Sequence, residues 1–368
     1  MKHRFLTLLG ILAMAIACSQ SPAAAQAPAT PAQKPASAKA ATGKATSKAA
    51  ARTAVPRTPW GEPDLSGVWN DATSTPLQRP SSVGGKDVLN DEEAEEFSKE
   101  LEHNLTRDRR DGSAAVDVNR AYNEHWMDAR RLKATEDHRT SLIVDPPDGR
   151  IPALVPLTGE RAEIKKARSY ANGRFLAGLP DSVYDFSLPV RCIIRTDSPP
   201  YLPTIYNNDF QIVQSPGFVT IAPEMIHSAR IIPTDGRPHL PGDIHQWLGD
   251  SRGHWEGDTL VVETTNFRAD EGVLFGGANA ATYKITERFT RVDATTLNYE
   301  FTVEDPTTWT RPWTARIPWT KIDPAEQMYE YACHEDNYDL VHFMSGARQR
   351  EREGKTIPIK PADRIFDN

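Results

Sequence analysis

The sequence predicts a mainly β protein in which an antiparallel meander closes into a lipocalin-like barrel or half-barrel. Three observations predict this class. From Tyr206 onward, apolar and polar residues alternate with a period of two, which is typical of strands with one buried face. Short polar turns separate these runs. No helical pattern lies between them, which favours antiparallel neighbours, and closure of the wall removes exposed edges.

The first 20 residues are predicted to be a signal peptide, because Lys2 and Arg4 precede a short apolar run. Cys18 follows small residues, as the lipid-accepting cysteine of a bacterial lipoprotein does, whereas "SPAAAQA" offers a cut to an ordinary signal peptidase. Both alternatives remain open. We therefore expect a lipoprotein of the periplasm or outer membrane, or a soluble secreted protein, with membrane contact only through the lipid anchor.

Residues 21–57 are predicted to be a disordered tether, because they are rich in Ala, Pro, Lys, Ser and Thr and have few large apolar side chains. The first 57 residues carry eight basic and no acidic residues, so the net charge of −7 for the whole chain leaves −15 for residues 58–368. This acidic part argues against a nucleic-acid partner. We expect it to be a single barrel-like domain with a helical insertion at about 88–180.

The elements before the meander are predicted from local signals. In "TPWGEPDLSGVWN" the last residues form a strand. In "NDEEAEEFSKELEHNL" Asn90 is the expected N-cap of a helix whose first turn is acidic. Trp126 is expected to anchor the polar stretch that follows, and a second helix is expected to begin near Thr158.

A hairpin is predicted over residues 139–156, around a Pro-Pro-Asp-Gly turn. The same Asp-Gly-Arg recurs in "IIPTDGRP". We predict that Gly149 and Gly236 both adopt a positive φ, which glycine does most readily.

The meander itself is predicted from hairpins with turns at Pro216–Gly217, at Glu256–Asp258 and around Asp293–Thr296. The segments "WTRPWTARIPWTKI" and "QMYEYACHEDNY" are expected to add the last strands. Trp309, Trp313 and Trp319 are interpreted as core residues rather than as a platform for sugars.

Six motifs carry a resemblance to known proteins: "TPWGEPDLSGVW", "RTSLIVDPPDGRIP", "DSRGHWEGDTLVVETTNF", "ERFTRVD", "EDPTTWTRPW" and "YACHEDNY". Across residues 58–345 the chain resembles a large group of secreted, uncharacterised bacterial proteins. This resemblance implies secretion and no particular activity. The Gly-x-Trp of "LSGVW" and the "GHWEGDTLVV" hairpin are similar to lipocalin-like barrels.

Two cysteines remain beyond the signal region, Cys192 and Cys333. In an oxidising compartment two such cysteines often pair, so we favour a disulfide over two buried thiols.

Alternation along the strands singles out a histidine and a glutamate. In "EMIHSARII", His227 shares a face with Met225 and Ile231, and in "TYKITERFTRV", Glu287 shares a face with Ile285 and Phe289. An inward carboxylate is costly unless it is paired. Glu287 is therefore expected either in a structural pair, with His227 or with an arginine such as Arg252, or as an acid–base group in a polar pocket.

Further candidates lie near these two. His334, Glu335 and Asn337 are expected at the end of a late strand, where a barrel mouth meets ligands, or in an ordinary polar turn. His334 joins His227 and Glu287 as a candidate catalytic residue. The candidate ligand-binding residues are Glu224, His245, Arg252, Glu335 and Asn337.

No metal site or cofactor is predicted. The histidines at 227, 239, 245 and 254 lie 12, 6 and 9 residues apart, which fits neither a helix face nor a short zinc knuckle, although ligands from separate strands stay possible. "DSRGHWEGD" lacks the alternating oxygen ligands of a calcium loop. No phosphate-binding loop, dinucleotide fingerprint or nucleophile elbow occurs.

We therefore expect a β-barrel protein that holds a small apolar or aromatic molecule in the barrel or at its mouth. The first alternative is an isomerase, lyase or hydrolase that uses a buried His/Glu pair. The second is an envelope interaction protein with a filled core and no ligand.

Overall fold

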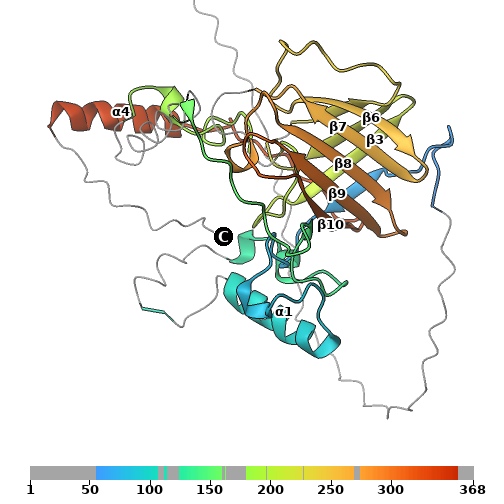
Figure 1. Ribbon diagram of the computed structural model, residues 1–368. Helices are drawn as coiled ribbons and strands as arrows, with labels where there is room; N and C mark the ends of the chain where they lie inside the picture. The colour runs from blue at the N-terminus through green and yellow to red at the C-terminus, as the bar shows by residue number, and fades with distance from the viewer. Residues whose placement is uncertain are drawn as a thin grey trace, which may run out of the picture. The chain divides into compact units, whose positions relative to one another are not determined.

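Ten strands form one antiparallel sheet that curls into a nearly closed barrel, which confirms the predicted fold class (Figure 1). The computed structural model describes residues 55–106, 112–113, 124–159, 162, 180–195, 197–226, 228–268 and 274–354. The strands are β1 Gly67–Asn70, β2 Ile143–Asp145, β3 Asp209–Ser215, β4 Phe218–Pro223, β5 Arg230–Pro233, β6 Asp250–Glu256, β7 Thr259–Thr265, β8 Lys284–Arg291, β9 Thr296–Glu304 and β10 Trp313–Lys321.

The N-terminal strand β1 joins two groups of strands that are consecutive in the sequence. The order across the sheet is β5-β4-β3-β1-β10-β9-β8-β7-β6, and β2 also pairs with β10. Trp69 of β1 lies opposite Phe210 of β3 and opposite Lys321 of β10. The wall is therefore completed by pairings between residues far apart in the sequence.

A seam separates the two ends of this order. In the described part of the chain no ladder of hydrogen bonds joins β5 to β6, yet the two strands run close together. Gly253 of β6 shows how close: a Cβ atom there would lie 3.0 Å from Ile232 Cγ2 and 3.1 Å from Thr234 Cγ2. A larger residue at this position would require these side chains to move by a few tenths of an ångström. The barrel is thus closed by packing at the seam.

The interior of the barrel is filled with large side chains. Phe210 and Trp319 stack with ring centroids 4.5 Å apart, and Tyr299 lies 4.9 Å from both Phe289 and Trp319. Trp309, Trp313 and Trp319 are all buried, so the prediction that they belong to the core is confirmed. Offset and edge-to-face aromatic pairs add to the hydrophobic stabilisation of such a core.

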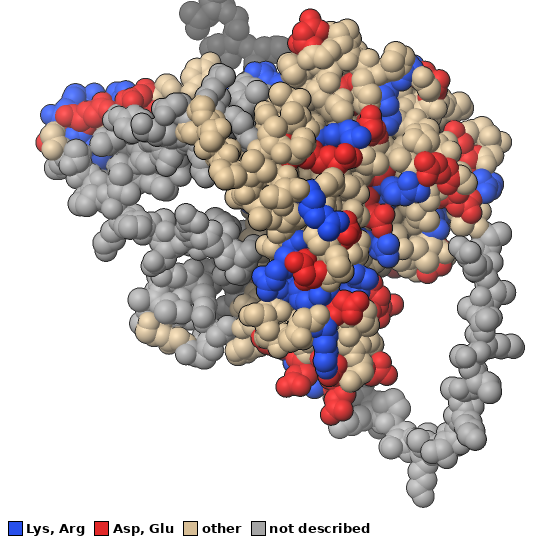
Figure 2. Space-filling model, in the orientation of Figure 1, with Lys and Arg blue, Asp and Glu red and all other residues tan. Residues whose placement is uncertain are grey.

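The predicted hairpins β3–β4, β6–β7 and β8–β9 are confirmed, and their outer faces carry paired charges. Arg316 of β10 bonds Glu300 of β9 at 2.7 Å, and Arg288 of β8 bonds Glu256 of β6 at 2.8 Å. Figure 2 shows basic and acidic side chains interspersed on the visible face. Exposed pairs of this kind contribute little to stability, about 0 to 1 kcal/mol each.

Two α-helices lie among the described residues, α1 Asp91–Leu105 and α4 Asp339–Arg352. The prediction of Asn90 as N-cap is confirmed: its side chain accepts from the Glu93 N–H, and Glu93 bonds back to the Asn90 N–H. α4 is not predicted. The expectation that Trp126 anchors its segment is wrong, because that side chain is 68% exposed. The helix predicted to begin near Thr158 falls mainly outside the described residues, as do the signal peptide and most of the tether.

One predicted hairpin and one predicted strand are wrong. Residues 139–156 do not form a hairpin, because β2 pairs with β10 while Leu154 bridges to Trp309. The segment "QMYEYACHEDNY" is not a strand either; it runs through a turn and into α4. Its tyrosines suit a strand, but Tyr329 is 73% exposed and its segment pairs with none of the described strands.

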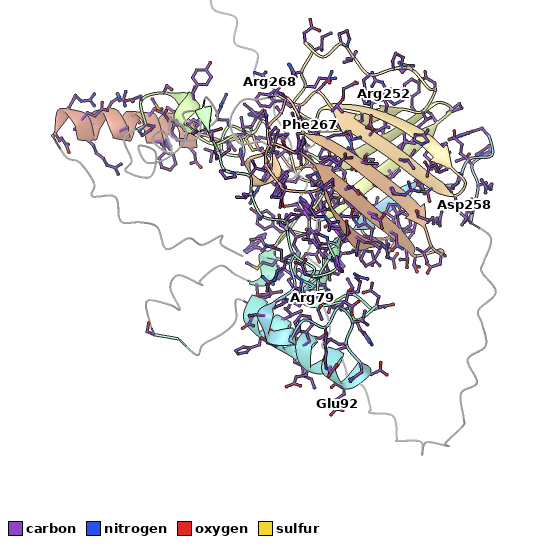
Figure 3. All side chains as sticks on the ribbon, viewed as in Figure 1. Arg79, Glu92, Arg252, Asp258, Phe267 and Arg268 are labelled. Carbon is purple, nitrogen blue, oxygen red and sulfur yellow. A yellow bond between two sulfur atoms is a disulfide. The ribbon has the colours of Figure 1, made fainter. Side chains whose placement is uncertain are left out.

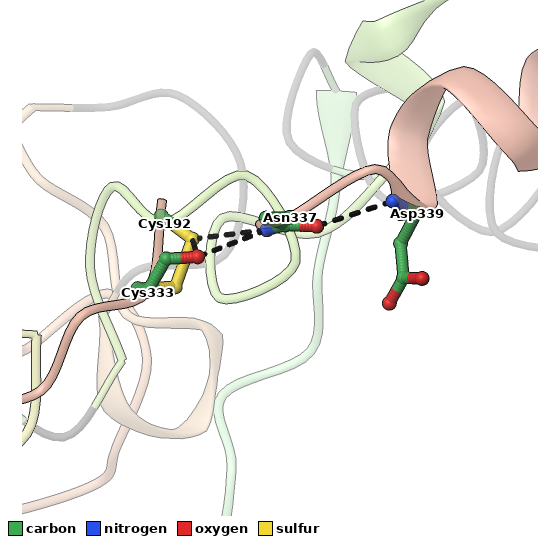
Figure 4. The surroundings of a disulfide bond; sticks show 4 residues. All are labelled: Cys192, Cys333, Asn337 and Asp339. Carbon is green, nitrogen blue, oxygen red and sulfur yellow. Dashed lines mark hydrogen bonds between the residues drawn. A yellow bond between two sulfur atoms is a disulfide. The ribbon is translucent and has the colours of Figure 1, made fainter. Parts of the chain in front are cut away.

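The predicted disulfide between Cys192 and Cys333 is confirmed, with Cα atoms 5.7 Å apart (Figure 4). Asn337 supports it by donating from Nδ2 to the Cys333 carbonyl at 3.1 Å, and the Asp339 N–H at the start of α4 donates to Asn337 Oδ1 at 3.3 Å. A bridge between residues 141 positions apart stabilises the fold by about 4–5 kcal/mol on the chain-entropy account. It ties the segment before β3 to the segment after β10.

Positive φ at the two Asp-Gly-Arg turns is confirmed, with 68° at Gly149 and 79° at Gly236. The two positions differ in their surroundings. A Cβ at Gly149 would lie 2.4 Å from Ser141 Oγ and 3.1 Å from Arg79 Cβ, whereas a Cβ at Gly236 would have no heavy atom within 4 Å.

Gly149→Ala is therefore expected to lower the free energy of unfolding by about 2–4 kcal/mol, because strain and overlap add. The matched control Gly236→Ala carries only the positive-φ strain, about 1 kcal/mol. Urea denaturation followed by tryptophan fluorescence measures both changes. Equal losses at the two glycines would contradict the structural difference between the turns.

Candidate functional site

A buried ion pair crosses the inside of the barrel. Arg230 is the first residue of β5 and Glu287 lies in the middle of β8, and their side chains are 3% and 0% exposed. Arg230 Nη1 donates to Glu287 Oε2 at 2.5 Å, and Nη2 donates to Oε1 at 3.0 Å. Two parallel bonds from one guanidinium to one carboxylate form the strongest kind of pair available to these groups. The pair joins the edge strand β5 to β8, with which β5 shares no hydrogen-bond ladder.

Two tyrosines complete the surroundings of the pair. Tyr299 donates its hydroxyl to Glu287 Oε1 at 2.9 Å, and the Tyr201 N–H donates to the Tyr299 oxygen at 3.1 Å. The guanidinium carbon of Arg230 lies 5.0 Å from the centre of the Tyr201 ring, a cation–π contact in a dry site. Both oxygens of Glu287 are therefore occupied by protein donors.

Burial and charge act in opposite directions on these groups. Burial by itself lowers the pKa of Arg230. The charge of Glu287, its hydrogen bonds to the guanidinium and the neighbouring tyrosines together outweigh burial, so the pKa is raised above its ordinary value and the guanidinium stays charged. Burial raises the pKa of Tyr299 well above its ordinary range, and the charge of Glu287 adds to this rise. Tyr299 thus remains a hydroxyl donor at all physiological pH values.

In β8 the buried side chains are those that the alternation of the sequence predicts to point inward, whereas in β5 they are not. Ile285, Glu287 and Phe289 are all buried on one face of β8. In "EMIHSARII" the strand begins only at Arg230, because Ile226 adopts a positive φ of 65° that interrupts the extended chain. Ile231, placed on the inward face by the sequence, is 63% exposed, and Arg230 points inward instead. The arginine that pairs with Glu287 is therefore Arg230 and not Arg252.

The three candidate catalytic residues are not brought together among the described residues. His227 lies outside them. Glu287 is fully buried in its pair, and His334 is exposed in the turn beside the disulfide. Glu335 is exposed in the same turn, while Asn337 holds the backbone of that turn.

A hollow of about 560 Å³ lies at the seam, where β5 and β6 begin. Its wall takes Arg230 and Ile231 from β5, and Asp250 and Ser251 from β6. Ile193, the residue after a disulfide cysteine, contributes from another part of the chain. The rest of the wall comes from residues 228–229, 245–249 and Arg268.

An arginine resting on a tryptophan forms part of this wall. The guanidinium carbon of Arg268 lies 4.2 Å from the centre of the Trp247 ring, and both residues are half-buried. Arg268 follows Phe267, whose side chain is fully buried in the core. Figure 3 shows these two residues next to each other, just beyond the strands. Because the side chain of Phe267 is buried in the core, it fixes the backbone next to Arg268.

One carboxylate in the wall is used to hold the loop between β5 and β6. Asp250 Oδ1 accepts from Arg252 Nη1 at 2.6 Å, and its Oδ2 lies 2.8 Å from His239 Nδ1 and accepts from the Leu240 N–H at 2.9 Å. This assigns Arg252 a structural contact with Asp250. His245, another candidate ligand-binding residue, is exposed and lines the hollow.

A second group of buried polar residues lies where β1 meets β3, and the sequence analysis does not find it. Asn70 donates to Asp128 Oδ2 at 2.8 Å and to Asp209 Oδ1 at 2.7 Å. Asp71 is 1% exposed, and no other described residue donates a hydrogen bond to its carboxylate oxygens. Burial raises the pKa of Asp71 well above its ordinary value, and the charges of Asp128 and Asp209 raise it further. The candidate residue Glu224 belongs to this group and not to the hollow: burial and the charge of Asp209 raise its pKa.

Comparison with known proteins gives no matching family model and no similar protein among those with curated functions. Within the described ranges, no three His, Cys, Asp or Glu side chains are placed to share a metal ion. No helix in that part of the chain has the length and hydropathy needed to cross a bilayer.

Glu287→Gln is expected to lower the free energy of unfolding by about 3–5 kcal/mol, because the buried charge of Arg230 loses its counter-charge. Glu300→Gln is the matched control, since it removes the carboxylate of an exposed Arg–Glu pair on the outer face, for a loss below about 1 kcal/mol. Urea denaturation compares the two. A loss at Glu287 as small as that at Glu300 would show that the interior pair does not stabilise the barrel.

Asp71→Asn is expected to raise stability at pH 8 and to have no such effect near pH 4. Because the folded-state pKa of Asp71 is raised, the folded state binds the proton more tightly, and stability falls as the pH rises above the unfolded-state pKa of about 3.9. Removing the buried charge should recover about 1–3 kcal/mol at high pH.

Asp293→Asn is the control of opposite sign. Hydrogen bonds from the Thr295 and Thr296 backbone lower the pKa of Asp293, so its carboxylate stabilises the fold above pH 4. Asp293→Asn should therefore lower the free energy of unfolding at pH 6 and 8. Denaturation curves at pH 4, 6 and 8 measure both variants. A pH-independent effect of Asp71→Asn would exclude the buried, poorly solvated carboxylate.

Proposed function

We propose that the protein binds a small, largely apolar or aromatic molecule in the hollow at the β5–β6 seam. The observation that carries this proposal is the hollow itself: its volume of about 560 Å³ lies within the range of small-molecule sites, which is roughly 300–1,000 Å³. Ile193, Ile231, Leu248 and the Trp247 ring supply apolar surface, and a few polar groups lie among them.

The close packing of the barrel interior supports a site at the seam over a site within the barrel. The aromatic side chains there are buried against one another, so protein side chains fill the interior. The same packing argues against acid–base chemistry at Glu287, because Arg230 and Tyr299 already occupy both of its oxygens. Binding without turnover is thus the simpler proposal.

The proposal includes export from the cytoplasm, with the first 20 residues as signal peptide and Cys18 or the "SPAAAQA" segment as the processing region. Its support is the disulfide, which persists in oxidising compartments and is rare in the cytosol. A soluble domain on a tether would then meet small apolar molecules outside the inner membrane.

Titration with the neutral dye N-phenyl-1-naphthylamine tests the binding proposal. Saturable fluorescence enhancement is expected, with a Kd of about 1–10 μM. Trp247→Ala should weaken binding about ten-fold, because a buried aromatic contact of this size contributes strongly to binding. Ile231→Asp should weaken it as well by placing a charge on an exposed wall position.

Trp126→Ala is the control, since Trp126 is exposed and does not line the hollow. It should leave the Kd unchanged. Absence of saturable enhancement, or equal Kd values in the Trp247 and Trp126 variants, would refute binding at the seam.

A further inference from the structure

A second hollow, of about 450 Å³, lies away from the seam, between the turn that follows β2 and the segment that precedes α1. Its wall is formed by residues 79–81, 85, 147, 148 and 150, and it shares no described residue with the seam hollow. Figure 3 labels Arg79 between the barrel strands and α1. We call this site the Arg79 hollow.

Arg79 is a buried arginine without a counter-charge. It is 6% exposed, and all of its hydrogen-bond acceptors are neutral. Nε donates to Thr140 Oγ1 at 3.0 Å, and Nη1 donates to the carbonyl oxygens of Gly85 and Pro147 at 3.2 and 3.0 Å. Among the described residues, no carboxylate forms an ion pair with this guanidinium. A buried positive charge of this kind is costly until an anion lies beside it.

The remaining nitrogen of the guanidinium, Nη2, is available to such an anion. It has no acceptor in the described part of the chain and is not fully enclosed by protein atoms, and Arg79 lines the hollow. The bonds of Nε and Nη1 hold the guanidinium in place, and the turn at Gly149 packs against it: a Cβ there would lie 3.2 Å from Arg79 Cζ. Nη2 therefore presents two N–H groups from a fixed position.

Arg150 adds a second positive charge to the wall. It is exposed, and its side chain has no hydrogen-bond or ion-pair partner among the residues that the structure describes. Of the described wall residues only Asp148 is acidic; it is exposed too, and its Oδ1 accepts from the Arg150 N–H at 3.1 Å. Ser81 contributes a hydroxyl to the same wall. Two arginines against one aspartate leave the wall with a net positive charge.

The number and placement of these donors favour a phosphate over a carboxylate. A phosphate group carries up to two negative charges and three acceptor oxygens, which two arginines and a hydroxyl on separate segments can surround. A free phosphate ion would fill only part of about 450 Å³, so the hollow also has room for the molecule to which the phosphate is attached.

We propose that the Arg79 hollow binds the phosphate group of a small polar phosphomonoester. Arg79 Nη2 donates to the phosphate oxygens at the buried side, and Arg150 compensates the remaining charge at the exposed side. This site is independent of binding at the seam.

Isothermal titration calorimetry of the full chain in a phosphate-free buffer, at constant ionic strength and pH 7.5, tests the proposal. The probes are glucose 6-phosphate, glucose, gluconate and inorganic phosphate. Glucose 6-phosphate should bind saturably with a Kd of about 1 mM or below. It should bind about ten-fold or more tightly than glucose or gluconate, because charge-assisted hydrogen bonds to a dianion are the strongest available here. Inorganic phosphate should bind more weakly than glucose 6-phosphate.

Each alternative result overturns a defined part of the proposal. Equal affinities for gluconate and glucose 6-phosphate would overturn the choice of phosphate. Equal affinities for inorganic phosphate and glucose 6-phosphate would assign the hollow to the free ion and overturn the phosphomonoester. Absence of saturable binding by glucose 6-phosphate would remove the site.

Exposed residues of the wall locate the binding. Arg150→Gln should raise the Kd for glucose 6-phosphate about three- to five-fold, as expected for a solvent-exposed charge. Asp148→Asn should lower the Kd about two-fold, because it removes a like charge and keeps an oxygen for the Arg150 N–H. Arg288→Gln is the matched control, since it removes an exposed arginine outside this wall, and it should leave the Kd unchanged.

Arg79→Gln should raise the Kd ten-fold or more, because it removes the buried donor. The variant also loses bonds to two carbonyls, so circular dichroism checks its fold, and the Arg150 variant decides if it does not fold. An unchanged Kd in folded Arg79→Gln, or equal Kd values in the Arg150 and Arg288 variants, would overturn the assignment of the site.

Discussion

The bidentate contact between Arg230 and Glu287 is the interaction on which the arrangement of the barrel depends. β5 is the end of the sheet, and its ladder to β4 is short. The buried pair adds a second attachment that reaches through the interior to β8. Removing two charges from water costs several kcal/mol, which good geometry and further hydrogen bonds must offset. Tyr299 and the ring of Tyr201 provide those further contacts.

The position of β5 explains why a hollow forms at the seam. With β5 held from inside the barrel, the seam with β6 closes by packing around Gly253 and needs no hydrogen-bond ladder. The loop between these strands is fixed to β6 through Asp250, and the disulfide holds the segment that carries Ile193. The candidate site is therefore built from three separately anchored segments, a common way to preorganise a binding surface.

The sequence predicts those features of the structure that residues close together in the chain determine. Alternation in β8 and β9 and the turn at Pro216–Gly217 are local, so the hairpins and the inward direction of Glu287 are predicted correctly. Alternation fails at Ile226, whose positive φ interrupts the extended chain, and in β5 both Arg230 and Ile232 are buried. The face that the sequence predicts to be buried contains His227 and Ile231; Ile231 is exposed, and His227 lies outside the described residues.

Pairings between distant segments lie beyond this kind of reasoning. Nothing in the residues around Trp69 indicates that β1 will lie between β3 and β10, and nothing in "TSLIVD" indicates β10 as its partner. The hollow arises from such long-range contacts. The sequence offers His245 as a polar candidate in a loop, but it does not indicate that Trp247 and Arg268 lie in the same wall.

Amide hydrogen exchange of β5 in the chain carrying Glu287→Gln tests the central role of the ion pair most directly. If the pair holds β5 in place, the Ile231 and Ile232 amides should exchange much faster than in the unsubstituted chain, while the β8–β9 hairpin keeps most of its protection under native conditions. Uniform acceleration over the whole sheet, or unchanged protection in β5, would contradict the account.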